Sequence, residues 1–196
     1  AVAVADLLWA REAGPDAQAA PGGNPMGRGE RGSAIRRGLE SFGGSKRRSE
    51  ILGEFGGVVF ADDYGHHPRE VRETIGGFRE FYPERRLIVD FMSHTYTRTE
   101  AFLDEFAEAF AAADEVILHK IYASAREKEG AVDGKTLFEK VKGRHPNVRY
   151  FHEVMDAREY LEEHLQEGDI FLTMGAGDNW RIGEEMVRLF SQEERS

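Results

Sequence analysis

The stretch VVFADDYGHHP, residues 58–68, contains the most information about the fold of this chain. Residues 58–61 are apolar and rich in β-branched and aromatic side chains, which is typical of a strand inside a sheet. Pro68 suits the first turn of a helix, because that position needs no backbone N–H donor. In an open α/β sheet, ligands bind where strands end at their carboxyl side. We therefore expect the polar residues 62–67 to face a ligand.

The same alternation continues along the chain. We predict strands near residues 50–54, 57–62, 86–92, 115–120, 148–152 and 169–174, and helices near 68–81, 98–112, 135–143, 156–165 and 179–190. Apolar strands that alternate with amphipathic helices indicate βαβ units and a mostly parallel sheet. Gly56-Gly57 predicts a tight turn between the first two strands, which adds an antiparallel edge hairpin. The expected fold class is α/β, a three-layer sandwich around a Rossmann-like sheet. The apolar stripe of helix 98–112 is expected to pack in the core.

The N-terminal region has a different composition. Residues 1–12 show apolar side chains at helical spacing, and a second short helix is predicted at 34–42. Between them, residues 14–33 are dense in glycine and proline, which predicts a mobile linker. The apolar part of the N-terminus is too short and too polar to span a bilayer, and it lacks a basic region before it. These features predict a cytoplasmic, soluble protein.

Composition limits the function further. The 196 residues are enough for one full domain, or for one domain and a fragment. The net charge of −10 argues against a nucleic-acid partner, since phosphate backbones are bound by basic surfaces. Any bound phosphate must be held locally by a few arginines and backbone N–H groups. The chain has no cysteine, which excludes disulfides, thiolate nucleophiles and thiolate metal ligands.

The polar segment 62–67 allows two interpretations besides a ligand site. Asp62, Asp63, His66 and His67 offer oxygen and imidazole ligands for a metal ion, although adjacent residues on a tight turn rarely all point at one ion. Alternatively, the aspartates cap the following helix.

Five motifs occur together in a familiar order. DDYGHHP at 62–68 is accompanied by FGGSKRRSE at 42–50, SHTYTRT at 93–99, IYASAREK at 121–128 and GDIFLTMGAGDNWRIG at 168–183. In this combination the chain resembles the C-terminal domain of the Mur ligase family, and specifically its alanine-adding members. The resemblance implies that residues 46–196 form this C-terminal domain and that residues 1–45 are a remnant of the central ATPase domain.

The resemblance also implies an activity. Such a ligase uses ATP and Mg²⁺ to turn the lactyl carboxylate of UDP-N-acetylmuramate into an acyl phosphate, which the amine of L-alanine attacks. The ATP and Mg²⁺ would be held mainly by the central and N-terminal domains. Gly134-Lys135-Thr136 resembles the end of a P-loop, but Glu129 replaces the required glycine and no strand precedes it. The isolated chain is therefore expected to be inactive. Its charge and composition predict no nucleic-acid or membrane partner.

Individual roles follow from the same resemblance. Arg48 is expected to reach the nucleotide phosphates, because a guanidinium binds phosphate oxygens with two parallel hydrogen bonds. Asp63 is expected to accept hydrogen bonds from the ribose of ATP. Lys46 and Arg47 are interpreted as a solvated basic linker, and Asp62 as a turn cap.

The amino-acid pocket is expected to contain Tyr64, His66, His94 and Arg98. His66 would take a proton from the attacking amine or orient it, since its ordinary pKa lies near physiological pH. Arg98 would bind the alanine carboxylate at the start of helix 98–112, where the helix dipole also favours anions. His66 and Arg98 are thus the catalytic candidates, and His67 is expected to support the loop.

The sequence departs from the family pattern at two positions. Thr95 stands where alanine-adding members usually have arginine, and Ser93 replaces a proline.

Two further loops match the family. Tyr122, Arg126 and Glu127 match a family segment and either bind a ligand or order the loop. The glycines of Gly175-Ala176-Gly177 permit close approach of a ligand or of another loop.

Three hypotheses remain open from the sequence. The chain is a ligase C-terminal domain, a nucleotide-binding or amino-acid-binding module without turnover, or a metal-dependent hydrolase built around DDYGHHP. The first requires that the loops after the second and third strands bring His66 and Arg98 together.

Overall fold

The computed structural model describes residues 32–33, 36–37, 45–125, 127 and 130–193. The chain divides into two compact units, residues 1–44 and 45–196, and the elements below all belong to the second. The predicted helix 1–12 lies outside the described residues. So do the predicted linker 14–33 and helix 34–42, apart from helical positions at 32–33 and 36–37.

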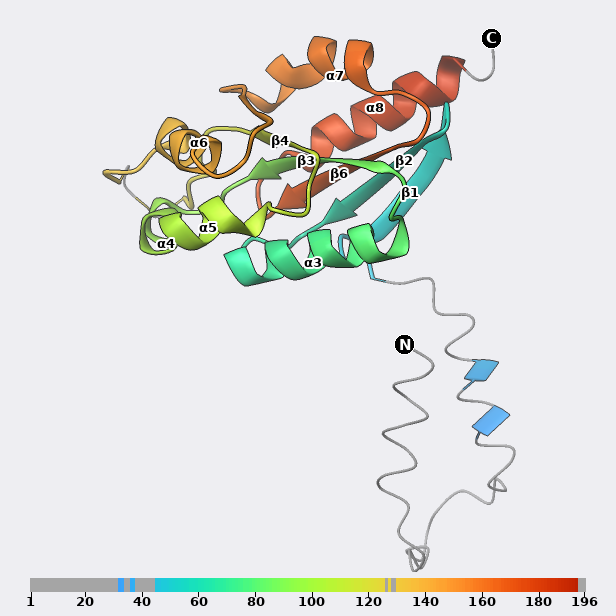
Figure 1. Ribbon diagram of the computed structural model, residues 1–196, viewed down its shortest axis with the longest axis horizontal. Helices are drawn as coiled ribbons and strands as arrows, with labels where there is room; N and C mark the ends of the chain where they lie inside the picture. Colours follow the sequence, from blue (N-terminus) through green and yellow to red (C-terminus); the bar gives the residue numbers. More distant parts are fainter. Residues whose placement is uncertain (1–31, 34–35, 38–44, 126, 128–129, 194–196) are drawn as a thin grey trace, which may run out of the picture. The chain divides into compact units, whose positions relative to one another are not determined.

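The second unit is built on one six-stranded sheet with strand order β1-β2-β6-β3-β4-β5 (Figure 1). The strands are β1 (Glu50–Phe55), β2 (Val58–Asp63), β3 (Arg86–Met92), β4 (Glu115–Leu118), β5 (Val148–Tyr150) and β6 (Asp169–Gly175). All neighbouring pairs are parallel except β1 and β2, which are antiparallel. The predicted α/β fold with an antiparallel edge hairpin is confirmed.

The hairpin turns at the predicted glycine pair. Gly56 and Gly57 have φ values of 57° and 72°, a backbone region that L side chains rarely adopt. A Cβ atom on Gly57 would also lie 2.6 Å from Cγ of Glu167. Glycine is therefore required there both by conformation and by space, and the turn fixes the register of β1 on β2.

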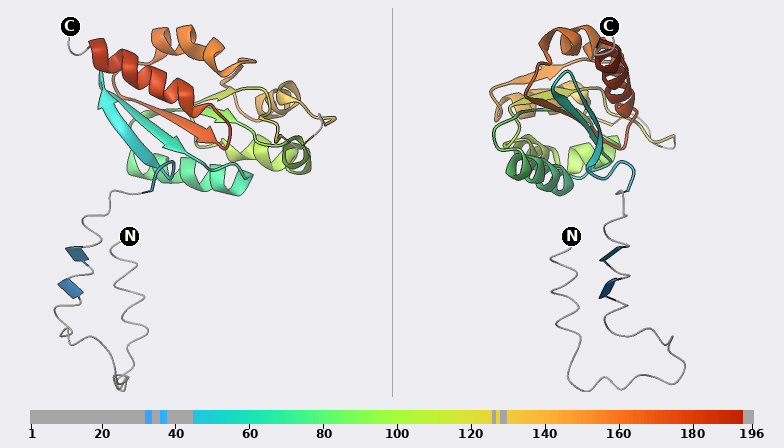
Figure 2. Two further views of the ribbon diagram at one scale, coloured as in Figure 1. Left: turned by 180° about the vertical axis from the view of Figure 1, so that it is seen from behind. Right: turned by 90° about the vertical axis from the view of Figure 1, so that its right-hand side faces the viewer.

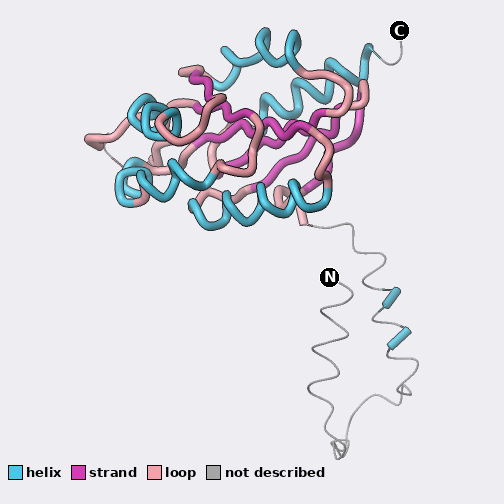
Figure 3. The backbone as a smooth tube through the Cα atoms, viewed as in Figure 1, coloured by secondary structure: helices cyan, strands magenta, loops and turns pink. Residues whose placement is uncertain are grey.

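Helices cover both faces of the sheet, as Figures 2 and 3 show from other directions and by element type. One face is covered by α3 (Pro68–Phe81), α5 (Leu103–Ala109) and α6 (Gly134–Lys142), and the other by η1 (Val154–Ala157), α7 (Arg158–His164) and α8 (Trp180–Glu193). Alternate residues of β3 enter the two cores: Val89 and Phe91 pack toward α3 and α5, whereas Ile88 and Met92 pack toward α7 and α8. The result is the predicted three-layer sandwich.

The predicted helix 98–112 is two helices. The first, α4, spans Tyr96–Ala101, and the chain kinks at Phe102 before α5 begins. Phe102 has φ −120° and ψ 25°, outside helical values, and its ring lies 4.6 Å from the ring of His67. The straight helix that the periodicity predicts is therefore interrupted at the residue that contacts His67. The apolar stripe is core as expected, since Phe106 and Phe110 are fully buried.

The carboxyl ends of β2, β3, β4 and β6 lie at the same edge, because these strands are parallel and in register. Four of the five sequence motifs lie at these strand ends and in the loops that follow them, and the motif at 42–50 precedes β1. No helix within the described part of the chain is both long and apolar enough to cross a membrane.

Candidate functional site

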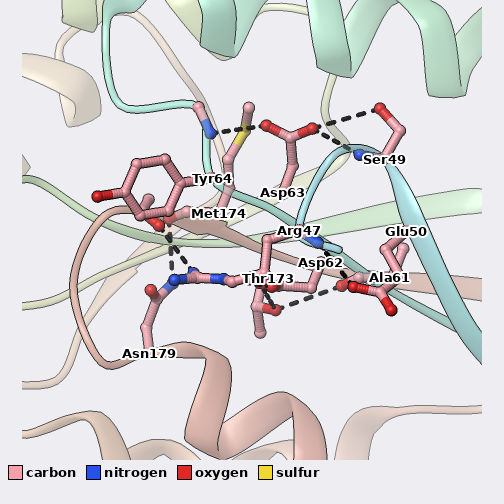
Figure 4. Close-up of polar contacts among 12 residues, drawn as sticks. Arg47, Ser49, Glu50, Ala61, Asp62, Asp63, Tyr64, Thr173, Met174 and Asn179 are labelled. Carbon is pink, nitrogen blue, oxygen red and sulfur yellow. Dashed lines mark hydrogen bonds and ion pairs between the residues drawn. The ribbon is translucent and has the colours of Figure 1, made fainter. Parts of the chain in front are cut away.

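The two aspartates that end β2 point to different partners, as Figure 4 shows. Asp63 accepts hydrogen bonds from the backbone N–H of Ser49 at 2.7 Å and from that of Gly65 at 2.7 Å. Asp62 instead forms an ion pair with Arg47, in which Nε and Oδ2 are 2.6 Å apart. Neither aspartate caps the helix that follows, so that alternative is wrong. The cap of α3 is His67.

A cavity of about 590 Å³ opens beside Asp63. Its walls are formed by the segment before β1, the end of β2 and the first turns of α3; they are Arg48, Ser49, Asp63, His67, Arg69, Glu70, Glu73 and Thr74. Oδ2 of Asp63 also accepts from the hydroxyl of Ser49 at 3.3 Å, so Oδ1, which among the described residues binds only the Gly65 N–H, is the oxygen that keeps one acceptor position. The cavity therefore brings together the two residues predicted to bind the nucleotide, Arg48 and Asp63.

His67 and Glu70 order the start of α3. Nδ1 of His67 accepts from the N–H of Arg69 at 3.3 Å, and Glu70 accepts from the N–H groups of His66 and His67 at 2.9 and 3.2 Å. Burial would raise the pKa of Glu70, but these N–H bonds and the charges of His66 and Arg48 lower it below its usual value. His67 thus supports the loop, in agreement with its expected role.

His66 presents a defined tautomer to the site. Its Nδ1 lies 2.9 Å from the carbonyl oxygen of Tyr64. Because a carbonyl only accepts, Nδ1 must carry the hydrogen in this contact, and the Nε2 of a neutral His66 then has a free lone pair. That nitrogen is able to accept a proton from a ligand.

The expected convergence of His66 and Arg98 is confirmed, with His94 between them. The rings of His66 and His94 are 5.9 Å apart in an edge-to-face arrangement. Nη1 of Arg98 lies 3.4 Å from Nδ1 of His94 and 3.3 Å from its carbonyl oxygen. Burial lowers the pKa of His94, and the charges of Arg98 and His66 lower it further. Neutral His94 therefore packs between the other two groups.

The helix that carries Arg98 begins at Tyr96, two residues before the predicted start. Arg98 is in the last turn of α4, and the amino end of that helix is already occupied by Glu127. This helix terminus therefore already has a carboxylate of the described chain as its partner, and binding of a substrate carboxylate by Arg98 stays a prediction. Among the described residues, no carboxylate oxygen lies within 4 Å of a nitrogen of the Arg98 guanidinium.

The two departures from the family pattern lie in this loop. Thr95 has φ 71°, which is unusual for a β-branched residue. Its backbone is held on both sides, by the Tyr122 carbonyl at 3.0 Å and by the hydroxyl of Thr99 at 2.7 Å. The buried hydroxyl of Ser93 bonds to the hydroxyl of Thr99 at 2.6 Å. Thr95 and Ser93 therefore order the turn, and neither supplies a cation.

The loop after β4 lies beside His94. Tyr122 stacks on His94 with 6.0 Å between ring centroids, and its N–H donates to the Ser93 carbonyl. Arg126 lies outside the described residues. At the end of β6, a Cβ on Gly175 would be 2.4 Å from the carbonyl oxygen of Met92, and in the loop that follows, a Cβ on Gly177 would be 2.6 Å from the Met92 sulfur. These glycines permit the close approach of the end of β3.

Several residues of the site were missed or misread. Arg47 was interpreted as solvated, but it is bound to Asp62 and to the carbonyl of Gly175. Beneath the site, buried Asp90 contacts Nε2 of His119 at 2.8 Å and accepts from Nδ2 of Asn179 at 3.0 Å. A charged residue inside the apolar run RLIVDFM was the available signal, since an aspartate is rarely buried without a partner.

The metal interpretation of DDYGHHP finds no cluster to support it. Within the described ranges, no group of three or more His, Asp or Glu side chains is arranged to hold an ion. Asp62, Asp63 and His66 have the separate partners given above. The segment Gly134-Lys135-Thr136 begins α6 after an Asp133 cap. It is a helix start and not a phosphate-binding loop between strand and helix.

Comparison with known proteins agrees with the motifs. Residues 47–177 match the family described as "Mur ligase, glutamate ligase domain". UDP-N-acetylmuramate–L-alanine ligase of Treponema pallidum is 54% identical over 162 residues, which are 82% of this chain and 34% of the relative. The ligase of the same name from Desulfosudis oleivorans is 44% identical over 156 residues, or 79% of this chain and 34% of the relative.

Solved structures show the same fold. The UDP-N-acetylmuramate-alanine ligase of Thermotoga maritima superposes with a TM-score of 0.67 at 23% identity, over 80% of this chain and 33% of that one. A folylpolyglutamate synthase/dihydrofolate synthase of Yersinia pestis, solved with AMPPNP and a Mn ion, has a TM-score of 0.53 at 15% identity, over 85% of this chain and 35% of that one. The chain spans about a third of the length of the curated relatives it matches. By its motifs and by the family match over residues 47–177, this chain belongs to the Mur ligase family and carries the glutamate ligase domain of that family.

Proposed function

We propose that this chain is the C-terminal domain of an ATP-dependent ligase that joins L-alanine to UDP-N-acetylmuramate through an acyl phosphate, in peptidoglycan precursor synthesis. The observation that carries the proposal is the convergence of His66, His94 and Arg98 at the carboxyl edge of the sheet. The 54% identity to the Treponema ligase supports the choice of reaction within the family. Residues 46–196 would be this domain, and residues 1–45 the end of the central ATPase domain.

In this proposal, Arg98 binds the carboxylate of L-alanine. Its guanidinium is half-buried and pairs with no carboxylate in the described part of the chain, so it is available to an anionic ligand. Thr95 leaves the site with one cationic group fewer than the alanine-adding pattern has. His94 remains neutral beside Arg98, which avoids repulsion between two cations.

His66 and Tyr64 orient the amine. Nε2 of His66 accepts a proton from the ammonium of alanine, while Nδ1–H stays bound to the Tyr64 carbonyl. The freed amine attacks the acyl carbon and the C–N bond forms. Phosphate leaves with the C–O bonding electrons, and the second proton that the nitrogen loses passes to the departing phosphate. Holding both reactants at one corner of the sheet lowers the entropic cost of this step.

The nucleotide would be held in the cavity beside Asp63. Arg48 would contact its phosphates and Asp63 its ribose, because the cavity of about 590 Å³ joins a cation to a carboxylate. ATP supplies the phosphoryl group that activates the lactyl carboxylate. Mg²⁺ would be held mainly by the central and N-terminal domains, which are the partners of this one. ATP and a nucleotide-sugar substrate also imply a cytoplasmic location.

The second candidate is a nucleotide-binding or amino-acid-binding module without turnover. Thr95 in place of the usual arginine favours it, since the anionic substrate is then held by fewer charges. The two candidates differ in turnover and not in binding.

A chimaera tests the reaction. Residues 46–196 would replace the matching third of the Treponema ligase, and phosphate release would be measured with ATP, Mg²⁺, UDP-N-acetylmuramate and L-alanine. We expect release that requires all of these reactants, and none from the isolated chain, because its sequence contains no P-loop. A chimaera that binds alanine without turnover would favour the second candidate.

Calorimetry of the isolated chain tests the site. Arg98→Ala should weaken L-alanine binding by about tenfold or more, since a charge-assisted pair is lost. Arg72→Ala, which removes an exposed arginine from α3, is the matched control. Equal affinities of the wild type and Arg98→Ala would exclude Arg98 from the pocket.

A further inference from the structure

Arg47 connects three separate parts of the fold. Its Nε is 2.6 Å from Oδ2 of Asp62 at the end of β2, and its Nη2 donates to the carbonyl oxygen of Gly175 at 2.9 Å. Its own carbonyl accepts from the N–H of Tyr64 at 2.8 Å. The segment before β1 is therefore tied to the carboxyl ends of both β2 and β6 through this single residue.

The carboxylate that binds Arg47 is that of Asp62, which forms a buried polar row with Thr173. Asp62 is 3% exposed and lies directly opposite Thr173 in the register of β2 and β6. Oγ1 of Thr173 donates to Oδ1 of Asp62 at 2.8 Å. A carboxylate buried to this extent requires a charged partner, and Arg47 is the cation in contact with it.

The backbone around Arg48 is strained. Arg47 and Ser49, the residues on either side, have φ values of 54° and 44°. Such values are uncommon for residues with a Cβ atom and persist only where the surroundings enforce them. Here the side chain of Arg47 anchors one side, and the bond from the Ser49 N–H to Asp63 anchors the other. The kink between these anchors carries Arg48.

Tyr64 links this kink to the group formed by His66, His94 and Arg98. The guanidinium carbon of Arg47 lies 5.1 Å from the centre of the Tyr64 ring, and that of Arg48 lies 6.0 Å from it. The ring of His66 also contacts Tyr64, with 5.3 Å between the ring centroids. Figure 4 shows Arg47 between the Tyr64 ring and the side chains of Asp62 and Thr173.

We propose that Arg47 is a positioning residue: its guanidinium fastens the segment 45–49 to the buried polar row, and so directs Arg48 into the cavity beside Asp63. The proposal rests on the proposed function, in which that cavity holds the nucleotide phosphates. The planar fork of Arg47 is essential, because it reaches Asp62 and the Gly175 carbonyl together. A lysine would keep the charge without these two simultaneous bonds.

The test uses the whole chain in four variants. Arg47→Gln removes the cation, and Arg47→Lys keeps the charge without the fork. The double variant Arg47→Gln/Asp62→Asn also removes the buried negative charge, so it retains the fold if Arg47→Gln alone does not. Lys46→Gln is the matched control, since it makes the same change of charge at the exposed neighbouring residue.

The first measurement is amide hydrogen exchange, which does not depend on a ligand. The N–H of Tyr64, which donates to the Arg47 carbonyl, should exchange about tenfold faster in the double variant and in Arg47→Lys. Amides in the middle of β3 and β6 should be unchanged, and Lys46→Gln should match the wild type throughout. Unchanged exchange at Tyr64 in the double variant would overturn the proposal.

The second measurement is ATP affinity by calorimetry. Relative to the wild type, the double variant and Arg47→Lys should bind ATP about tenfold more weakly, and Lys46→Gln within about twofold. Restored affinity in Arg47→Lys would overturn the proposal, since charge alone would then suffice. If the wild type binds no ATP, the nucleotide site of the proposed function fails, and the exchange measurement alone decides whether Arg47 orders the segment.

Discussion

Glu127 and Thr97 join the loops after β4 and β3. Oε1 of Glu127 accepts from the backbone N–H of Thr97 at 2.9 Å and from its hydroxyl at 2.8 Å, while Oε2 accepts from the N–H of Tyr96 at 2.9 Å. The carboxylate thus satisfies the first N–H groups of α4, where a negative charge is favourable. The hydrogen bond from the Thr97 N–H is the main cause that lowers the pKa of Glu127. Arg98 is positioned by a helix that another loop caps.

Glu127→Gln should loosen α4. The amide accepts fewer and weaker hydrogen bonds than the carboxylate, so the N–H groups of Tyr96 and Thr97 should exchange faster than in the wild type. Because the folded pKa of Glu127 is lowered, the contribution of its charge is present above the ordinary value and is lost as pH falls through the folded pKa. Glu100→Gln, on the exposed side of the same helix, is the control, and equal exchange in both variants would contradict the role of Glu127.

His94 should titrate below its ordinary pKa of 6.5 in an NMR experiment, because it is partly buried and faces Arg98 and His66. Arg98→Gln should raise this pKa, whereas Glu127→Gln should lower it further, since Glu127 is the neighbour that favours the proton. Below pH 6.5 the unfolded chain takes up this proton first, so the stability contributed by neutral His94 is lost as pH falls through the folded pKa. A shift in the same direction for both variants would refute this electrostatic explanation.

The buried contact between His119 and Asp90 should be essential for stability. Burial alone would lower the pKa of His119, but the charge and hydrogen bond of Asp90 and the carbonyl of Phe151 raise it. Its proton therefore stabilises the fold below the ordinary value, and this contribution is lost as pH rises through the raised folded pKa. His119→Leu leaves Asp90 buried with Asn179 alone and should cost about 3 kcal/mol or more of unfolding free energy in urea denaturation.

The matched variant is His119→Leu/Asp90→Asn, which removes both charges. It should be more stable than His119→Leu, because the uncompensated carboxylate is gone. If the double variant were the less stable of the two, the explanation by an unpaired buried charge would be wrong.

Gly175→Ala should destabilise the fold. Gly175 has φ 135°, and a Cβ would lie 2.4 Å from the Met92 carbonyl oxygen, so β3 and β6 would have to separate at the site. We expect a loss of about 2 kcal/mol or more in thermal or urea unfolding. Gly76→Ala is the opposite case: space is open around Gly76 inside α3, and alanine should stabilise that helix by about 0.5–1 kcal/mol. Equal effects would show that contact with Met92 is unimportant.

The fold could be predicted because its information is local. The apolar run Val58–Ala61 and the glycine pair Gly56-Gly57 identify a buried strand and the turn before it from neighbouring residues alone. The kink at Phe102 could not be predicted in this way. It occurs at a residue whose ring contacts His67, more than thirty residues earlier in the chain, and such a contact is not visible in the local periodicity.

The site was predicted in part for the same reason. Parallel strands bring their carboxyl ends to one edge, so the meeting of His66, His94 and Arg98 follows from strand order and direction. The partners of the charged groups do not follow from it. Arg47 was interpreted as solvated, and the capping of the Arg98 helix by Glu127 was not predicted, because both contacts join residues far apart in the sequence.

The sequence alone determined the alternation of strands and helices, the edge hairpin and the family. It also determined the edge of the sheet at which His66, His94 and Arg98 meet. All of these depend on short-range periodicity, turn chemistry and the order of motifs. Three-dimensional packing alone selected which carboxylate meets Arg47, which side chain caps α4 and which charges lie buried beneath the site. The physical reason is that hydrogen bonds and ion pairs between side chains require atoms within about 3 to 4 Å. Such distances are set by the packing of elements far apart in sequence.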